Sequence, residues 1–216
     1  MDGMSVEQAL LSFAVVAALL TIIPGLDTIL VLRASIAQGR LHGYATALGI
    51  NAGAMAWGAA AAVGASALLA ASETAFTVLQ FAGAAYMIWL GATMLWRSFR
   101  RGPVKNLEDP QAHPGRGGLL LSWAKGAGTN LLNPKVGVFY IAMIPQFIPE
   151  GAPPLAMGIA LAGVHNLLGL AWFSLIINGT HLVRGKLQRP GFVRATDRVT
   201  GLALVGFGAS LAFKGR

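Results

Sequence analysis

The fold is decided by two short stretches in which a proline interrupts an apolar run, TIIPGLDT at residues 21–28 and NLLNPK at residues 130–135. Proline lacks a backbone N–H and clashes with the preceding helical turn, so it kinks or interrupts a helix and frees carbonyl groups. Inside a membrane those groups must line a polar cavity or pack against protein, because lipid offers them no hydrogen bond. Each stretch also carries an ionisable side chain, Asp27 in the first and Lys135 in the second. Both stretches therefore predict a broken helix beside a polar cavity.

The composition of the chain indicates an integral membrane protein. Of its 216 residues, 55% are hydrophobic and only 11% are charged, whereas about 25% of the residues in soluble domains carry a charge. Residues 41–72 and 151–183 contain no Asp, Glu, Lys or Arg, and apolar stretches of this length can cross a bilayer. The net charge of +8 comes from short segments between apolar runs, where basic residues set topology, so nucleic-acid binding is not expected.

Hydropathy predicts six membrane spans. A helix rises about 1.5 Å per residue and the hydrocarbon core is about 30 Å thick, so one span needs roughly 20 apolar residues. The last apolar run is short, and its helix could include part of the basic segment before it. The sequence thus predicts an all-α integral membrane protein with six transmembrane helices at residues 6–32, 43–71, 75–96, 119–148, 153–182 and 199–214.

Lys and Arg residues alternate between the predicted loops. They gather in loops one, three and five, and loops two and four contain none. Because cytoplasmic loops carry the excess of Lys and Arg, this alternation places the odd loops in the cytoplasm and both termini outside it. The first eight residues carry Asp2 and Glu7 rather than basic residues, so the first apolar run is interpreted as a permanent helix and not as a signal peptide.

Segment 98–117 divides the chain into two halves, 1–97 and 118–216, within one predicted transporter domain that spans residues 1–216. The segment contains Pro103, Pro110 and Pro114 together with several glycines, a composition typical of a linker. Each half holds three spans, so the second half enters the membrane from the opposite side, which is the topology of an inverted repeat. The two interrupted spans, the first and the fourth, each open one half.

Candidate solute-binding residues surround the two interruptions. An ionised side chain near the middle of a bilayer costs about 2.5–3.5 kcal/mol, so the presence of Asp27 and Lys135 requires an explanation. Two explanations stay open: the side chains form a buried ion pair that joins the halves, or they bind the solute or a proton. The helix breaks themselves add five candidates, Pro24, Gly25, Asn130, Asn133 and Pro134.

Three further polar residues lie in otherwise apolar spans, Asn51 in the second span and His165 and Asn166 in the fifth. Amide side chains supply both donors and acceptors, and a histidine titrates near neutral pH. Such residues either join membrane helices by hydrogen bonds or contact a ligand. We include all three among the candidate binding residues.

Several other kinds of site are not indicated. The chain has no cysteine, no His and Glu spacing typical of a zinc site and no nucleophile paired with a base, so we expect no metal, no cofactor and no enzymatic activity. Gly126 and Gly128 lack the context of a phosphate-binding loop. Gly49 and Gly53 have the spacing that lets membrane helices approach closely, which leaves a monomer and a homodimer both open.

The two interrupted stretches also carry a family resemblance. PGLDT at residues 24–28, followed by Gly39 and ALG at 47–49, resembles the LysE/RhtB family of amino-acid exporters. NLLNPK at 130–135, followed by Phe139 and PQF at 145–147, is similar to that family's signature in its fourth hydrophobic segment. Leu26 departs from the family's usual Pro-Gly-Pro, and it restores a backbone N–H at this position, which puts the shape of the break and the substrate preference in doubt.

The resemblance implies a six-helix exporter in the bacterial inner membrane that moves amino acids or close derivatives by secondary transport, with lipid as its surroundings. It supports Pro24, Gly25, Asp27, Asn130, Asn133, Pro134 and Lys135 as site residues. We expect proton-coupled alternating access by rocking of the two halves, in which Asp27 binds an ammonium group or a proton, and Lys135 holds a carboxylate. Two alternatives stay open: an exporter of another small solute, such as a cation or a toxic compound, and a membrane scaffold that transports nothing.

Overall fold

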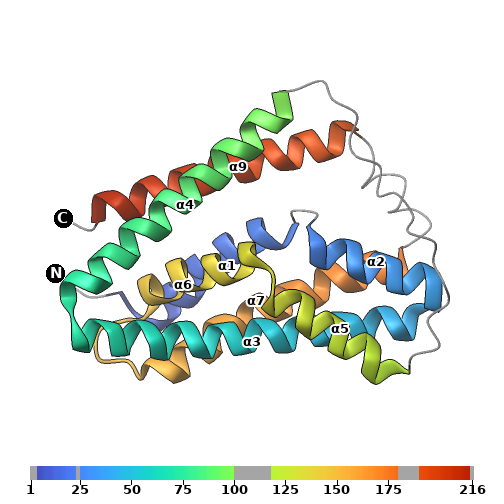
Figure 1. Ribbon diagram of the computed structural model, residues 1–216, viewed down its shortest axis with the longest axis horizontal. Coiled ribbons are helices and arrows are strands. Elements are labelled where there is room, and N and C mark those ends of the chain that lie inside the picture. The colour runs from blue at the N-terminus through green and yellow to red at the C-terminus, as the bar shows by residue number, and fades with distance from the viewer. Residues whose placement is uncertain (1–3, 23–24, 100–117, 180–189, 215–216) are drawn as a thin grey trace.

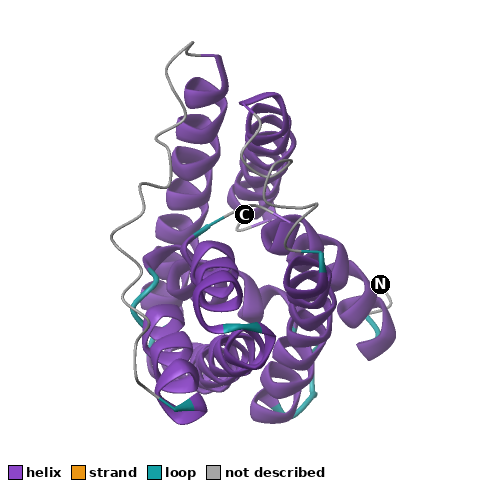
Figure 2. Cartoon of the chain, turned by 90° about the vertical axis from the view of Figure 1, so that its right-hand side faces the viewer, coloured by secondary structure: helices purple, strands orange, loops and turns teal. Residues whose placement is uncertain are grey.

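The computed structural model describes residues 4–22, 25–99, 118–179 and 190–214, and within these ranges all regular secondary structure is helical (Figures 1 and 2). This confirms the predicted all-α class. The linker expected at 98–117 lies outside the described residues except for its first two, 98 and 99. The helices are α1 (Val6–Ile22), α2 (Leu26–Gln38), α3 (Arg40–Ala71), α4 (Glu73–Phe99), α5 (Leu119–Leu131), α6 (Pro134–Met143), the 3-10 helix η1 (Ile144–Phe147), α7 (Pro154–Asn178) and α9 (Pro190–Lys214).

Four of the six predicted spans are long and apolar enough to cross a membrane. Helices α3, α4 and α7 meet this condition individually, and α1 with α2 meets it as one span bent by 57° at the predicted interruption. The fourth predicted span is also broken, into α5 and α6. Several boundaries differ from the prediction: α9 begins at Pro190 rather than 199, the first span continues to Gln38 rather than 32, and α3 begins at Arg40 rather than 43. Helix α4 continues to Phe99, two residues into the expected linker. The count of six spans itself stays a prediction.

The two halves of the chain interlock. The most extensive contacts pair α4 with α9, α3 with α5 and α3 with α7, and each of these pairs joins one half to the other. Helices α4 and α9 cross along one side of the molecule, at the top of Figures 1 and 2, while the remaining helices form the body below them. No large rearrangement can therefore move one half as a unit without separating these helix pairs.

Small residues bring α3 and α5 into close contact. A Cβ atom at Gly53 would lie 2.8 Å from Asn130 Oδ1 and 3.1 Å from the Ala127 carbonyl oxygen, and Cβ atoms at Gly49 and Gly126 would strike the backbone of Trp123 and Thr46. The small-residue motif at Gly49 and Gly53 is thus used inside the chain, between α3 and α5. It gives no support to a homodimer.

Two apolar cores flank the helix breaks. The larger one joins α1, α6, η1 and α7 around the buried rings of Phe13, Phe139 and Phe147. The smaller one joins α2, α3 and α7 around buried residues such as Val31 and Ile176. The first break thus joins a helix of the larger core, α1, to a helix of the smaller core, α2, while α6 starts at the second break and belongs to the larger core.

The helix ends next to the basic, odd-numbered loops of the prediction lie opposite the two chain ends along the long axis of the molecule. In Figure 1 both chain termini lie at the left, whereas the α2–α3 junction and the ends of α4, α5, α7 and α9 that adjoin the undescribed loops lie toward the right. The basic residues Arg33, Arg40 and Arg198 belong to this second set of ends, and the Arg198 guanidinium lies 4.8 Å from the centre of the Phe99 ring. The described helix ends that adjoin the odd loops of the prediction therefore lie toward one end of the helix bundle.

Candidate functional site at the junction of two helix breaks

The first break separates α1 from α2. Helix α1 ends at Ile22, and Gly25 caps α2 with an extended backbone (φ −129°, ψ −167°) and no side-chain hydrogen bond. Asp27 follows in the first turn of α2, where the partial positive charge of a helix N-terminus stabilises a carboxylate. Pro24, a predicted site residue, lies outside the described residues.

The second break separates α5 from α6 and is closed by its own side chains. Asn133 caps α6 through its Oδ1 atom, which accepts a hydrogen bond of 3.2 Å from the Lys135 N–H. Pro134 occupies the start of α6, where its missing N–H costs nothing. Val136 and Gly137 donate their N–H groups to the Asn133 carbonyl at 3.1 and 3.0 Å. The sequence Asn-Pro-Lys therefore ends one helix and starts the next within three residues.

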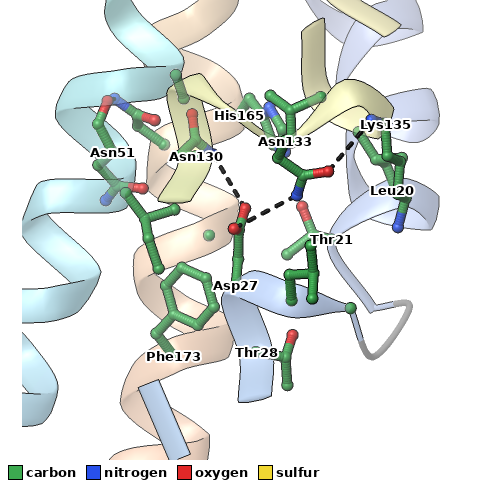
Figure 3. A pocket seen from close by; sticks show the side chains of 17 residues that line it. Leu20, Thr21, Asp27, Thr28, Asn51, Asn130, Asn133, Lys135, His165 and Phe173 are labelled. Atoms are coloured by element: carbon green, nitrogen blue, oxygen red, sulfur yellow. Dashed lines mark hydrogen bonds between the residues drawn. The ribbon is translucent and has the colours of Figure 1, made fainter. Parts of the chain in front are cut away.

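The two breaks meet at one carboxylate. Asp27 Oδ2 accepts a hydrogen bond of 2.9 Å from Asn130 Nδ2, and Asp27 Oδ1 accepts one of 3.4 Å from Asn133 Nδ2 (Figure 3). Both asparagines are buried, with 2% and 6% of their surfaces exposed. Residues more than a hundred positions apart, from opposite halves of the chain, thus hold a single charged group between them.

Lys135 does not pair with Asp27. The hydrogen-bond partners of the Asp27 carboxylate are the two asparagine amides, and its oxygens lie beyond the 4.0 Å limit of an ion pair from the Lys135 ammonium. Figure 3 shows the Lys135 side chain extending away from Asp27, beside Leu20. Of the two explanations for these charges, the buried ion pair between the halves is therefore not the one that this structure contains.

The predicted polar residues gather around one partly open cavity, whose atom-free space of about 540 Å³ includes solvent at its mouth. Eight of the ten candidates line it. Pro24 is outside the described residues, and Pro134 starts α6 beside the cavity. The eight lining candidates are Gly25, Asp27, Asn51, Asn130, Asn133, Lys135, His165 and Asn166.

Sequence reasoning missed the remaining walls of this cavity. Two threonines flank the first break: Thr21 donates its hydroxyl to the Ala17 carbonyl at 2.7 Å, and Thr28 is buried in the first turn of α2. Their position beside Pro24 was the signal that could have identified them. The apolar wall, by contrast, carries no signal that separates it from lipid-facing residues, and consists of Leu20, Leu26, Ile50, Ala54, Val136, Gly169 and Phe173.

The cavity wall contains polar atoms without a partner among the described residues. They are the donor Asn51 Nδ2 and the acceptors Asn130 Oδ1 and Asn166 Oδ1. Asn166 Nδ2, in contrast, donates a hydrogen bond of 3.0 Å to the Asn51 carbonyl and so joins α7 to α3. A buried polar atom that lacks a hydrogen bond costs about 1–3 kcal/mol, so these three atoms favour a polar solute or water in the cavity.

His165 lines the cavity from α7 and contacts Tyr140 on the side away from the cavity. Its Nδ1 atom lies 2.8 Å from the hydroxyl oxygen of Tyr140, and the two rings stack with centroids 5.6 Å apart. Tyr140 is fully buried in α6, one and a half turns after the second break. The sequence had indicated His165 but not the tyrosine behind it.

Comparison with known protein families agrees with this geometry. The model of the family described as LysE type translocator matches residues 18–215, which is nearly the whole chain. The chain belongs to the LysE-type translocator family. It is therefore a membrane transport protein, and the resemblance based on residues 24–28 and 130–135 is confirmed. This family is a family of transporters and not of enzymes.

Individual relatives of this translocator cover almost its full length. YrhP of Bacillus subtilis, an uncharacterized membrane protein, is 32% identical over 207 residues, which cover 93% of this chain and 97% of YrhP. The leucine efflux protein of Klebsiella pneumoniae is 31% identical over 205 residues, covering 94% of this chain and 93% of that protein. The leucine efflux protein of an Enterobacter species is 29% identical over 205 residues, covering 93% of each chain. No solved structure matches the translocator.

Proposed function

We propose that this translocator exports neutral amino acids with an aliphatic side chain, and that the solute binds in the cavity between the two helix breaks. The observation that carries the proposal is the Asp27 carboxylate, held by Asn130 and Asn133 where both halves of the chain meet. Broken helices at corresponding places in two halves are a recurrent way of building a transporter's binding site. A carboxylate at such a point is suited to bind the ammonium group of an amino acid.

The cavity offers complementary groups for both charged ends of an amino acid. The Asp27 carboxylate lines the cavity and is suited to an ammonium group, which has three donors. Lys135 lies in the first turn of α6, where a cation does not stabilise the helix, and together with the helix N-terminus it is suited to a carboxylate. Asp27 and Lys135 form no ion pair with each other, and the electrostatic surroundings of Lys135 include two carboxylates, Asp27 and Asp197.

The apolar wall supports an aliphatic side chain as the third feature of the solute. Ile50, Ala54 and Phe173 line the cavity together with Val136. Two of the relatives above carry the name leucine efflux protein, which supports the same class of solute. A hard cation is the weaker alternative, because Asp27 is the single carboxylate among the described lining residues, and Ca²⁺ or Mg²⁺ sites collect more oxygen ligands.

Export coupled to protons fits a single enclosed carboxylate. Asp27 would bind the ammonium group in one direction of the cycle and a proton in the other, so that the site never holds an uncompensated charge. Alternating access would then arise at the helix breaks. The interlocked contacts of α3 with α5 and α7 favour this over the predicted rocking of whole halves, because rocking would separate those helices.

The predicted topology belongs to this proposal. Among the described residues each half contains a broken span followed by two long helices, as expected for two inverted three-helix repeats in one domain. In this proposal the protein crosses the bacterial inner membrane six times. The basic helix ends face the cytoplasm, so both termini lie outside it. The position of the termini opposite those basic ends supports this orientation.

The test is amino-acid efflux from bacterial cells that are preloaded with mixed dipeptides, with intact protein compared with Asp27→Asn at equal membrane abundance. We expect the intact protein to release leucine-like amino acids selectively and Asp27→Asn to lower that release on the order of a hundredfold, because the ammonium loses its charged partner. Glu73→Gln is the matched control, since this exposed carboxylate lies at the start of α4, outside the cavity lining.

The outcomes separate the alternatives. Equal release of amino acids with and without the protein would contradict amino-acid export and favour another solute. Full activity of Asp27→Asn would contradict the assigned site. In vesicles with an imposed pH gradient, export by the intact protein should follow the gradient, and any residual export by Asp27→Asn should not.

A further inference from the structure

A fully buried tyrosine supports the cavity without lining it. Tyr140 has 0% of its surface exposed and packs among Phe13, Phe139 and other apolar side chains of the larger core. Its ring lies against α3, where a Cβ atom at Gly58 would come within 3.4 Å of Tyr140 Cε1. A hydroxyl group in such a place destabilises the fold unless it is hydrogen-bonded. The hydrogen-bond partner of the Tyr140 hydroxyl therefore indicates the function of this tyrosine.

The hydrogen bond between Tyr140 and His165 determines which nitrogen of the histidine carries the hydrogen. The 2.8 Å contact with His165 Nδ1 is the hydrogen bond that the structure gives the Tyr140 hydroxyl. If the histidine donated, the buried O–H of the tyrosine would have no acceptor among the described residues, at a cost of about 1–3 kcal/mol. The tyrosine therefore donates and Nδ1 accepts. In that tautomer the hydrogen of the ring is on Nε2.

The Nε2–H group of His165 is the ring donor that can contact a solute in the cavity, because Nδ1 is occupied by Tyr140. His165 lines the cavity with Asp27, Asn51 and Lys135, while its Nδ1 edge faces Tyr140. Phe139 packs against the imidazole at 6.0 Å and an interplanar angle of 61°, which limits rotation of the ring. A fixed N–H donor on the cavity wall is suited to an oxygen of the solute's carboxylate.

We propose that Tyr140 is a positioning residue that holds His165 in the tautomer with hydrogen on Nε2, and that this N–H binds the carboxylate of the transported amino acid. The identity of the ligand rests on the proposed function. The tautomer of His165 does not depend on it. The proposal divides the cavity by chemistry: Asp27 recognises the ammonium end of the solute, and His165, held in one tautomer by Tyr140, recognises the carboxylate end together with Lys135.

The tautomer is tested by nitrogen NMR on protein labelled at the histidine ring nitrogens, with His165→Gln used to assign the signals. The intact protein should show an unprotonated Nδ1 and a protonated Nε2 at His165. Tyr140→Phe should show a mixture of the two tautomers, because the ring loses the donor that fixed it. A protonated Nδ1 in the intact protein, or an unchanged spectrum in Tyr140→Phe, would overturn the assignment.

The binding role is tested with two partial analogues of leucine that compete for its transport into inside-out vesicles. One is 4-methylpentanoate, which lacks the ammonium group, and the other is 3-methylbutylamine, which lacks the carboxylate. In Tyr140→Phe the KM for leucine and the inhibition constant of 4-methylpentanoate should rise by the inverse of the fraction that keeps hydrogen on Nε2, about twofold for an even mixture of tautomers. The inhibition constant of 3-methylbutylamine and the maximal rate should stay unchanged.

A matched control is available in the same protein. His42 Nδ1 lies 2.8 Å from Ser122 Oγ between α3 and α5, and neither residue lines the cavity. Ser122→Ala removes the hydroxyl partner of a histidine without reaching the site, so it should leave all of these constants unchanged. A rise for both analogues in Tyr140→Phe would overturn the carboxylate role. Failure of the intact protein to transport any amino acid would contradict the proposed function, while the NMR result would still decide the tautomer.

Discussion

The two helix breaks perform the same task by different means. The second is capped from within, because Asn133 accepts the N–H of Lys135 at 3.2 Å and Pro134 begins the next helix. The first has Gly25 at the cap and no side-chain hydrogen bond there. The second break thus has a shape fixed by its own residues, whereas the first depends on Asn130 and Asn133 to hold its carboxylate.

This difference assigns separate roles to the breaks. The first contributes the charge, at a helix N-terminus where an anion is stabilised. The second contributes the amide donors, from a rigid frame that does not need the first break for its own closure. A change in the distance between the breaks would therefore alter the hydrogen bonds of Asp27 while each break kept its own shape. Such a response could couple solute binding to the opening of the cavity toward one side of the membrane or the other.

The largest expected effect comes from moving the charge to the other break. In the double variant Asp27→Asn with Asn130→Asp, the cavity keeps one carboxylate and one amide but exchanges their places. Asn130 lies in the last turn of α5, where the helix carbonyls disfavour an anion. We expect leucine export to stay as low as in Asp27→Asn alone, on the order of a hundredfold below the intact protein.

Efflux from dipeptide-loaded cells measures this, with Asn130→Asp alone as the comparison. Recovery of most of the lost export in the double variant would show that the cavity needs a carboxylate but not one at the first break. The separation of roles between the breaks would then be wrong.

The breaks were also the part of the site most open to sequence reasoning. Proline inside an apolar run, next to Asp27 in one case and Lys135 in the other, has few explanations in a membrane helix. The sequence could not tell whether these two charges pair, because an ion pair and two separate sites need the same residues. The hydrogen bonds of Asn130 and Asn133 to Asp27 resolve it, and they depend on how the two halves pack.

The rest of the site follows from packing that the sequence does not encode locally. Phe173 and Ile50 resemble any other apolar residue of a membrane helix until α3 and α7 are placed together. Tyr140 gave no signal either, because an aromatic residue in an apolar segment usually belongs to a core. The closeness of Gly53 to Asn130 likewise became visible only when α3 and α5 were in contact.

A smaller effect is expected from Gly53→Ala, which disturbs the second break from outside. The added Cβ would lie 2.8 Å from Asn130 Oδ1 and 3.0 Å from Asn130 Cβ, so the asparagine must move and its hydrogen bond to Asp27 cannot keep its geometry. Losing that charged hydrogen bond should lower leucine export about tenfold. Gly64→Ala is the control: it lies on the same helix with nothing within 4 Å, and export by this variant should be normal. Equal effects of the two changes would attribute the loss to helix α3 in general.

The smallest effect separates the two functions of Asn133. Asn133→Ala removes both the cap of α6 and the 3.4 Å hydrogen bond to Asp27, whereas Asn133→Ser keeps a capping hydroxyl that is too short to reach Asp27. The free energy of unfolding in detergent should fall by about 1 kcal/mol for Ala and by much less for Ser. Leucine export should fall by a similar, roughly threefold factor in both, because a long hydrogen bond contributes little. If Ser instead restored export as well as stability, Asn133 would act only through the shape of the break, and Asn130 would be the sole amide that holds the carboxylate.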